Sequence, residues 1–272
     1  MDLPDLKEDS QRDKKLMKKI TIIFIAFLIF IPISANATTV GLWCFDEGAG
    51  TTAYDSSGYG NDGTLVNNLT WSTDTPFTYS GNNSLSFDGS DDYVEVSDSS
   101  SLNPSIVTVE AWFKLDTLST RPHIVGKGTA SVGSYWLVAE TSTKARFFYD
   151  LGGGWNYIES DTSLNSNTWY HIAGTYDSEY ARIFLNGSLE KQAYNVGTLR
   201  DDTYPLIIGS GDGYGYTDGL IDEVRISNTA LSVDELGYHQ SCVPEPATMI
   251  LLGSLATGLF GFAGLKRRFS GR

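Results

Sequence analysis

The strongest constraint in this sequence is a period-two alternation of apolar and polar residues that recurs in short segments along most of the chain. The segments are rich in β-branched and aromatic residues, and Gly, Asn, Asp and Ser separate them. Such alternation turns one face of a strand toward a core and the other toward solvent. The pattern predicts thirteen strands, at residues 39–45, 84–88, 93–97, 106–115, 124–127, 135–140, 145–150, 155–160, 168–176, 181–185, 189–194, 205–209 and 219–227.

Helical patterning is evident at one place in the segment that carries these strands. Ser232 and Glu235 form a Ser-x-x-Glu capping box, which predicts a short helix reaching about His239. Asn186-Gly187 lies between two strands and predicts a hairpin, because both positions of such a turn favour positive φ. We therefore expect residues 38–242 to form one all-β domain, a two-sheet antiparallel sandwich with one short C-terminal helix.

The first 37 residues have the parts of an N-terminal signal peptide. Lys18 and Lys19 precede the largely apolar run 20–33, and an Ala-x-Ala pattern ends at Ala37. The run is short for a membrane span, which needs about 20 residues, so we expect export and cleavage after Ala37. An uncleaved anchor is the alternative, and Met17 would serve as a later start.

The other end of the chain combines a proline-containing motif, an apolar run and a basic cluster. The motif is Val243-Pro244-Glu245-Pro246, the uncharged run covers residues 247–265, and Lys266-Arg267-Arg268 follows. As a helix the run would be about 28 Å long at ~1.5 Å per residue, which matches a bilayer core. It predicts a transmembrane helix with its basic end in the cytoplasm and residues 38–243 outside.

These three parts, in this order, resemble the PEP-CTERM sorting signal, which we assign to residues 243–272. The resemblance implies a Gram-negative bacterium, processing by an exosortase near residues 244–246, and release or attachment at the cell surface. It also implies association with exopolysaccharide or biofilm matrix. The residues by themselves indicate only a C-terminal membrane anchor.

The exported part of the chain is strongly acidic. Residues 38–243 hold 9 basic and 27 acidic side chains, a net charge of -18. Such a surface repels nucleic acid and anionic lipid, and it is compatible with neutral glycans and divalent cations. Solubility is the alternative explanation of the charge.

Ten short segments spread over residues 41–226 form a recognisable series. They are Gly41-Leu42-Trp43, Phe45-Asp46-Glu47-Gly48, Asp55-Ser56-Ser57-Gly58, Gly60-Asn61-Asp62-Gly63, Ser84-Leu85-Ser86-Phe87-Asp88-Gly89, Asp92-Tyr93-Val94, Val107-Thr108-Val109-Glu110-Ala111-Trp112-Phe113-Lys114, Trp169-Tyr170-His171-Ile172-Ala173-Gly174-Thr175-Tyr176, Leu185-Asn186-Gly187 and Gly219-Leu220-Ile221-Asp222-Glu223-Val224-Arg225-Ile226. In their order and spacing these segments resemble the LamG-like jelly-roll family of the concanavalin A-like lectin/glucanase group. The resemblance implies a two-sheet jelly roll, often with one calcium ion, that commonly serves as a binding or adhesion module.

Asp222 is the starting point for a calcium site. Alternation puts it on one face with Leu220, Val224 and Ile226, toward the interior, and a buried carboxylate needs a partner. Calcium takes about 6–8 oxygen ligands, and the Gly-bent loop 55–63 supplies such oxygens. The resemblance implies that this loop meets the Asp222 strand. The predicted calcium ligands are Asp55, the Gly60 carbonyl, Asn61 and Asp222.

Other acidic residues have simpler explanations. Asp55 and Asn61 can instead cap turns, with Asp222 accepting backbone hydrogen bonds. The run from Asp88 to Asp92 lacks the downstream pattern of an EF-hand, so we interpret it as an acidic turn.

Cys44 and Cys242 are the only cysteines. An exported protein meets an oxidising compartment, where two cysteines tend to pair, and a jelly roll often brings its ends together. We predict a Cys44–Cys242 disulfide; the alternatives are a buried Cys44 and a free Cys242.

Catalysis is not expected. A retaining glycosidase needs two carboxylates about 5–5.5 Å apart, and the Glu-x-Asp-x-x-Glu strand of sandwich glucanases is missing. Glu110 stands alone in its strand, where we expect a framework or solvated role, and His123, His171 and His239 are isolated.

Binding is the function that the sequence favours. Trp155, Tyr157, Tyr214 and Tyr216 lie in or beside Gly-rich loops, where exposed rings can stack on sugars. Aromatic residues also serve sandwich cores, so a structural role is the alternative. We predict a non-catalytic, exported module that binds an extracellular glycan or matrix protein. The rivals are a purely structural matrix protein and a glycosidase with an unfamiliar set of residues.

Overall fold

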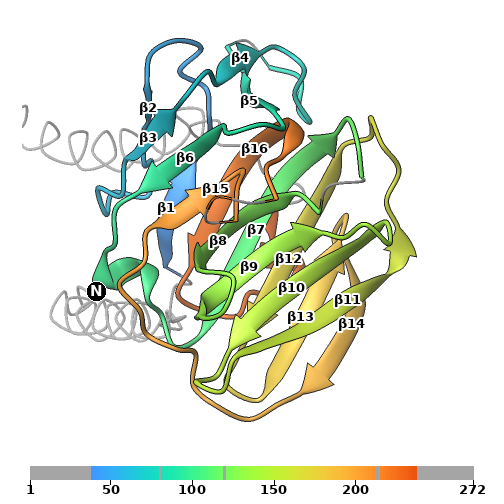
Figure 1. Ribbon diagram of the computed structural model, residues 1–272. Helices are drawn as coiled ribbons and strands as arrows, with labels where there is room; N and C mark the ends of the chain where they lie inside the picture. Colours follow the sequence, from blue (N-terminus) through green and yellow to red (C-terminus); the bar gives the residue numbers. More distant parts are fainter. Residues whose placement is uncertain (1–37, 80, 119–120, 212, 214, 238–272) are drawn as a thin grey trace, which may run out of the picture. The chain divides into compact units, whose positions relative to one another are not determined.

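The computed structural model describes residues 38–79, 81–118, 121–211, 213 and 215–237. They form two antiparallel β-sheets, which confirms the predicted all-β sandwich (Figure 1). The predicted signal peptide (1–37), Cys242, the Val243-Pro244-Glu245-Pro246 motif and the helix 247–265 lie outside the described residues. Within the part that is described, no helix is long and apolar enough to cross a membrane.

Sheet A has eight strands. The strands in spatial order are β14 (Ser188–Tyr194), β13 (Tyr180–Leu185), β12 (Tyr170–Tyr176), β7 (Val107–Leu115), β16 (Asp218–Ser227), β5 (Ser84–Asp88) and β4 (Thr70–Ser72), with β1 (Thr39–Trp43) beside β16.

Sheet B also has eight strands, and Figure 1 shows it in front of sheet A. All of its pairings are antiparallel. The strands in spatial order are β11 (Trp155–Ser163), β10 (Lys144–Asp150), β9 (Gly133–Ala139), β8 (His123–Gly128), β15 (Leu206–Ile208), β6 (Tyr93–Val96), β3 (Gly63–Val66) and β2 (Thr52–Ala53).

The core lies between the two sheets. Phe113 of β7 and Ile221 of β16 face Leu137 of β9 and Phe147 of β10, and each is at most 1% exposed. Each of these residues alternates with one on the outer face of its sheet, as the period-two pattern predicts. This packing leaves two outer faces for display, one on each sheet.

All thirteen predicted strands are present, with bounds that differ by at most three residues. Three further strands, β2, β3 and β4, were not predicted. They have two to four residues each, which is too short for a period of two to stand out.

Strand β16 departs from simple alternation at a bulge. Its pairing with β7 shifts between Asp222 and Arg225, and Glu223 adopts a φ of 50°. The extra residue reverses the faces of the strand. Asp222 therefore lies opposite Trp112 on the outer face of sheet A, whereas Val224 belongs to the core. The predicted shared face was wrong, although Asp222 is fully buried.

The predicted C-terminal helix is smaller than expected. The Ser232 N–H donates to the Glu235 carboxylate, as in a capping box. The helix is a single 3-10 turn, η2 (Val233–Glu235), because Leu236 turns to an extended ψ of 149°. A second 3-10 turn, η1 (Ser100–Leu102), precedes β7.

We expect Leu137→Ala to lower the free energy of unfolding by about 2–5 kcal/mol, because it leaves a cavity between the sheets. Leu189→Ala on β14 is the matched control, since Leu189 is 51% exposed, and it should change stability by less than about 0.5 kcal/mol. Urea unfolding followed by tryptophan fluorescence measures both. Equal losses in the two variants would contradict the assigned core.

Candidate functional site

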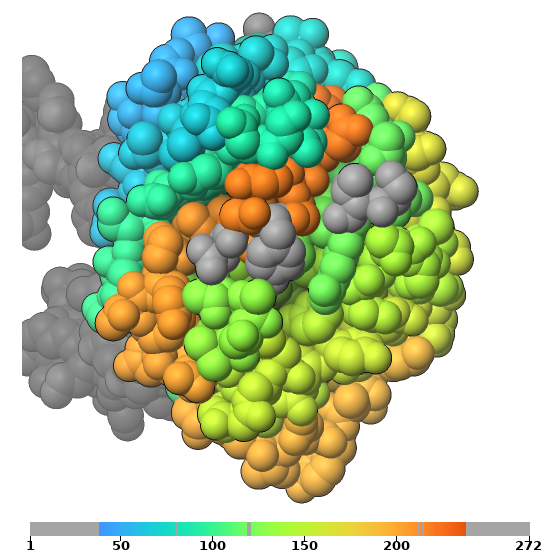
Figure 2. All heavy atoms as spheres, in the orientation of Figure 1, coloured from blue at the N-terminus to red at the C-terminus, as the bar shows by residue number. Residues whose placement is uncertain are grey.

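Three aromatic side chains form a row across the outer face of sheet B. Phe148 of β10 is paired directly with Trp136 of β9 on one side and with Tyr157 of β11 on the other. With neighbouring strands about 4.8 Å apart, the three positions span about 10 Å. We call Trp136, Phe148 and Tyr157 the aromatic row. Figure 2 presents the face of the molecule on which it lies.

The row passes from a buried end to an open end. Trp136 is 3% exposed and lies flat over Gly126 of β8, where an added Cβ would come within 2.3 Å of the indole. Its ring N–H is buried and has no hydrogen-bond partner among the described residues. Phe148 is half-buried, and Tyr157 is 54% exposed with its ring centroid 5.4 Å from that of Phe148. The row therefore offers one open ring, that of Tyr157.

Two arginines cover faces of these rings. The Arg121 guanidinium lies 5.3 Å from the Phe148 ring centroid, and that of Arg146 lies 4.4 Å from the Tyr157 centroid. The Glu140 carboxylate, 9% exposed, pairs with Nε of Arg121 at 2.6 Å and with a terminal nitrogen of Arg146 at 2.9 Å. Glu159 pairs with Arg146 at 2.7 Å. The guanidinium groups are thus held in place and neutralised.

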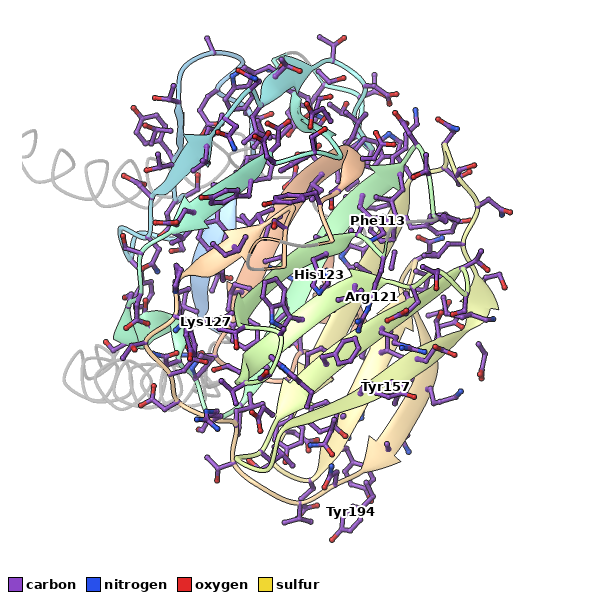
Figure 3. All side chains as sticks on the ribbon, in the orientation of Figure 1. Phe113, Arg121, His123, Lys127, Tyr157 and Tyr194 are labelled. Atoms are coloured by element: carbon purple, nitrogen blue, oxygen red, sulfur yellow. The ribbon has the colours of Figure 1, made fainter. Side chains whose placement is uncertain are left out.

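His123 completes this part of the face. Its ring meets that of Trp136 edge-on at 5.1 Å, and Figure 3 labels it with Arg121 and Tyr157. Burial, assisted by the charge of Arg121, lowers the pKa of His123 to about 4. The ring is therefore neutral at pH 7 and adds no charge to the face.

The predicted ligand-binding residues are only partly brought together. Trp155 and Tyr157 both contact Phe148, but Trp155 is half-buried and donates its ring N–H to the Thr129 carbonyl. Tyr216 is half-buried beside Tyr93, whose pKa is raised by burial and by the charges of Glu95 and Tyr216. Tyr214 lies outside the described residues.

Sequence reasoning missed Trp136, Phe148, Arg121, Arg146 and Glu140. Trp136 and Phe148 alternate with core residues on strands that were predicted, so the sequence could have predicted that they point outward. The sequence could not predict that they lie in one row, because the row depends on how three strands are paired.

The predicted calcium loop uses its oxygens internally. One oxygen of Asp55 accepts hydrogen bonds from the backbone of Leu42 and Ser57, and the other from the Ser57 hydroxyl and the Asn61 backbone. The Asn61 amide donates to the Val40 carbonyl and to Ser101. Asp55 and Asn61 therefore organise a turn, and Asp222 lies on β16 beside other carboxylates.

Asp222 lies on the outer side of sheet A, opposite Trp112. One of its oxygens accepts the Glu223 N–H at 2.8 Å, and the other is buried without a hydrogen-bond partner among the described residues. Burial and the negative charges of Glu223 and Asp46 raise the pKa of Asp222 well above its usual value. The Tyr79 hydroxyl lies 3.1 Å from Asp46 and 3.3 Å from Glu223. Clustered carboxylates of this kind suit a divalent cation.

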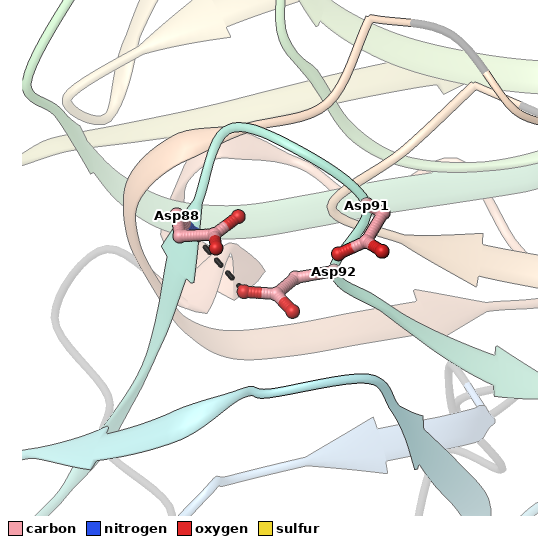
Figure 4. Close-up of side chains that lie close together, drawn as sticks. All are labelled: Asp88, Asp91 and Asp92. Carbon is pink, nitrogen blue, oxygen red and sulfur yellow. Dashed lines mark hydrogen bonds between the residues drawn. The ribbon is translucent and has the colours of Figure 1, made fainter.

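Asp88, Asp91 and Asp92 form a second acidic group, at the turn between β5 and β6 (Figure 4). Asp92 is buried, and its two oxygens accept the backbone N–H groups of Asn68 and Asp88. Its side chain therefore ties the turn together, in agreement with the predicted acidic turn.

Glu110 and His171 pair on the outer face of sheet A. Both are 1% exposed, and His171 Nε2 lies 3.0 Å from the Glu110 carboxylate. Arg225 pairs with the same carboxylate, which also accepts the Gly237 N–H. Although burial acts to raise it, the pKa of Glu110 is lowered by the His171 hydrogen bond and the Arg225 charge. Glu110 is a framework residue, one of the two predicted roles.

Cys44 is buried at the end of β1, with its Sγ 3.7 Å from the Ser56 hydroxyl. Its predicted disulfide partner, Cys242, lies outside the described residues. The bond stays a prediction.

Two sequence profiles match the chain. The profile described as concanavalin A-like lectin/glucanases superfamily matches residues 88–237, and the profile of the PEP-CTERM protein-sorting motif matches residues 243–268. No curated protein matches the sequence.

Solved structures resemble the domain at low sequence identity. Domain 4 of AbnA, a GH43 extracellular arabinanase from Geobacillus stearothermophilus solved with arabinotriose, has a TM-score of 0.60 at 16% identity, covering 73% of this chain and 96% of that one. A botulinum neurotoxin type C structure, from work on cell entry through two ganglioside molecules, has a TM-score of 0.55 at 13% identity, covering 73% and 49%. The chain therefore spans about half of that neurotoxin structure, and these likenesses show the fold alone.

We expect Glu110→Gln to destabilise the protein by about 3–5 kcal/mol at pH 7, because Arg225 loses its buried partner. The folded-state pKa of Glu110 lies below its ordinary value of 4.5. Its stabilisation is therefore present above that value and lost as the pH falls through the folded-state pKa. Urea unfolding at pH 7 and pH 3 should show a difference that shrinks in acid, whereas the exposed control Glu179→Gln stays near wild type. A pH-independent difference would contradict the ion pair.

Proposed function

The chain belongs to the concanavalin A-like lectin/glucanases superfamily, and from this premise we propose that it is a non-catalytic carbohydrate-binding module whose site is the outer face of sheet B. The aromatic row carries the proposal. An exposed ring on a rigid strand can stack on the apolar face of a sugar, and nearby polar groups can bond its hydroxyls. Tyr157, which is 54% exposed, supplies the open ring.

The structural neighbours support carbohydrate as the ligand class. AbnA domain 4 was solved with arabinotriose, and the type C neurotoxin study concerns two ganglioside molecules. The AbnA structure is thus one case of a sugar ligand with a domain of this fold. For this chain, the proposal of carbohydrate binding depends on its own aromatic row.

The absence of catalysis is part of the proposal. A glycosidase needs a carboxylic acid and a second carboxylate free to act on the sugar. On the described part of this face, Glu140 and Glu159 are both engaged in ion pairs with arginine. Release of reducing sugar from a bound polysaccharide would favour the glycosidase instead.

The C-terminal motif supplies the cellular setting. The PEP-CTERM match indicates an exported protein of a Gram-negative bacterium that is transiently anchored in a membrane and processed by an exosortase. We propose that the mature domain acts at the cell surface or in the extracellular matrix, where an extracellular glycan or matrix protein is its partner. A purely structural matrix role is the rival, and it requires no glycan affinity.

Calcium is a proposed structural ion of this module. We place it at Asp222, with Asp46 and Glu223 as the neighbouring carboxylates, because Asp222 keeps one buried oxygen without a partner. The loop of Asp55, Gly60 and Asn61 is the less favoured position, since the Asp55 oxygens already accept hydrogen bonds. A bound cation would offset the repulsion among these carboxylates.

We expect Tyr157→Ala to weaken glycan binding about tenfold, or ~1.4 kcal/mol, because the stacking ring is removed. Tyr194→Ala is the matched control: Tyr194 is 67% exposed but lies on β14 of sheet A (Figure 3). A glycan array with the full-length chain identifies a ligand, and calorimetry compares the variants. If the chain bound no glycan on the array, or if both variants lost the same affinity, the proposed site would be excluded.

Calcium at ~100 times its Kd should stabilise the wild type by about 2.7 kcal/mol, or roughly 5–10 °C in Tm. Asp222→Asn should remove this response, whereas Asp234→Asn, at an exposed position in η2, should keep it. Thermal melting with calcium and with chelator provides the measurement. An unchanged Tm in the wild type would overturn the calcium proposal.

A further inference from the structure

We propose that the carbohydrate bound on the outer face of sheet B is uncharged, and that Glu140 sets this selectivity; the inference rests on the binding function proposed above. The few cations of this domain are almost all paired with its own carboxylates.

Residues 38–243 hold nine Lys and Arg side chains, and all nine are described. Eight of them pair with a carboxylate. The ninth, Lys144, donates to the Asp161 carbonyl. Uronate and sulfate groups are bound by Arg and Lys through charge-assisted hydrogen bonds. This part of the chain therefore keeps no arginine without a carboxylate partner for an anionic sugar.

On the outer face of sheet B, too, each arginine is matched by a carboxylate. Its two arginines, Arg121 and Arg146, are matched by Glu140 and Glu159. His123 adds no charge, because it is buried against Trp136. An anionic sugar would have to displace Glu140 from both guanidinium groups, and the net charge of -18 on residues 38–243 would repel it as it approached. A neutral sugar meets neither cost.

Glu140 is the residue on which the balance depends. Among the described residues it is the one carboxylate that pairs with both arginines, and it is buried in the turn between β9 and β10. Its removal would leave Arg121 without a carboxylate partner, while Arg146 would keep Glu159. The two guanidinium groups would remain beside the rings of Phe148 and Tyr157. The aromatic row, with Arg121 left without a carboxylate partner beside it, would then favour anionic sugars.

The first experiment measures binding of the full-length chain to two neutral polysaccharides, dextran and arabinan, and two anionic ones, alginate and polygalacturonate. We expect binding to a neutral probe to be at least tenfold tighter than to either anionic probe. We also expect it to change less than twofold between 50 and 500 mM salt, because no charges are paired. Binding to an anionic probe as tight as to a neutral one would overturn the selectivity while leaving the binding function intact. Binding to no probe would remove both.

The second experiment uses Glu140→Gln, with Glu179→Gln on the β12–β13 turn as the matched control that removes one exposed carboxylate elsewhere. We expect Glu140→Gln to raise affinity for the anionic probes about tenfold, with a salt dependence that the wild type lacks, and the control to match wild type. Should Glu140→Gln fail to melt cooperatively, Glu159→Gln tests the same balance through the other partner of Arg146. An anionic affinity unchanged in a folded variant would exclude a selective role for Glu140.

Discussion

The burial of one face of each sheet against the other is the interaction on which the rest of this structure depends. Each strand has two faces, so the side chains that fill the core, such as Leu137 and Phe147, determine which of their neighbours point outward. Trp136 and Phe148 are the outward neighbours of these two residues. The candidate binding face is therefore a direct consequence of the core. If a strand shifted its pairing by one residue, its inward-facing and outward-facing side chains would change places.

The polar groups follow a second constraint, the shortage of cations. Three buried acidic positions pair with four of the nine cations of residues 38–243: Glu110 with Arg225, Asp202 with Lys127, and Glu140 with Arg121 and Arg146. A buried charge that lost its partner would cost several kcal/mol. These four cations therefore stabilise buried carboxylates, and the net charge of the domain stays negative. A soluble, acidic domain with a locally neutral aromatic face is the result.

Asp222 shows how a local irregularity changes the chemistry of a site. The bulge in β16 puts Val224 and Ile226 on the core side, so Asp222 does not share a face with them. Asp222 lies on the outer face opposite Trp112, where it meets the negative charges of Asp46 and Glu223. The sequence carries no sign of this bulge, because a non-glycine residue, Glu223, adopts the positive φ.

The sequence by itself determined the strand pattern, the turns, the acidic charge and the sorting motif at residues 243–268. These properties are local, and short-range alternation, turn residues and composition encode them. Only the tertiary structure decided that Trp136, Phe148 and Tyr157 form one row, that Glu140 holds two arginines beside it, and that Asp55 ties a turn. Those arrangements depend on pairing between strands and on side chains from distant segments, and no period along one strand records which partner lies across from it.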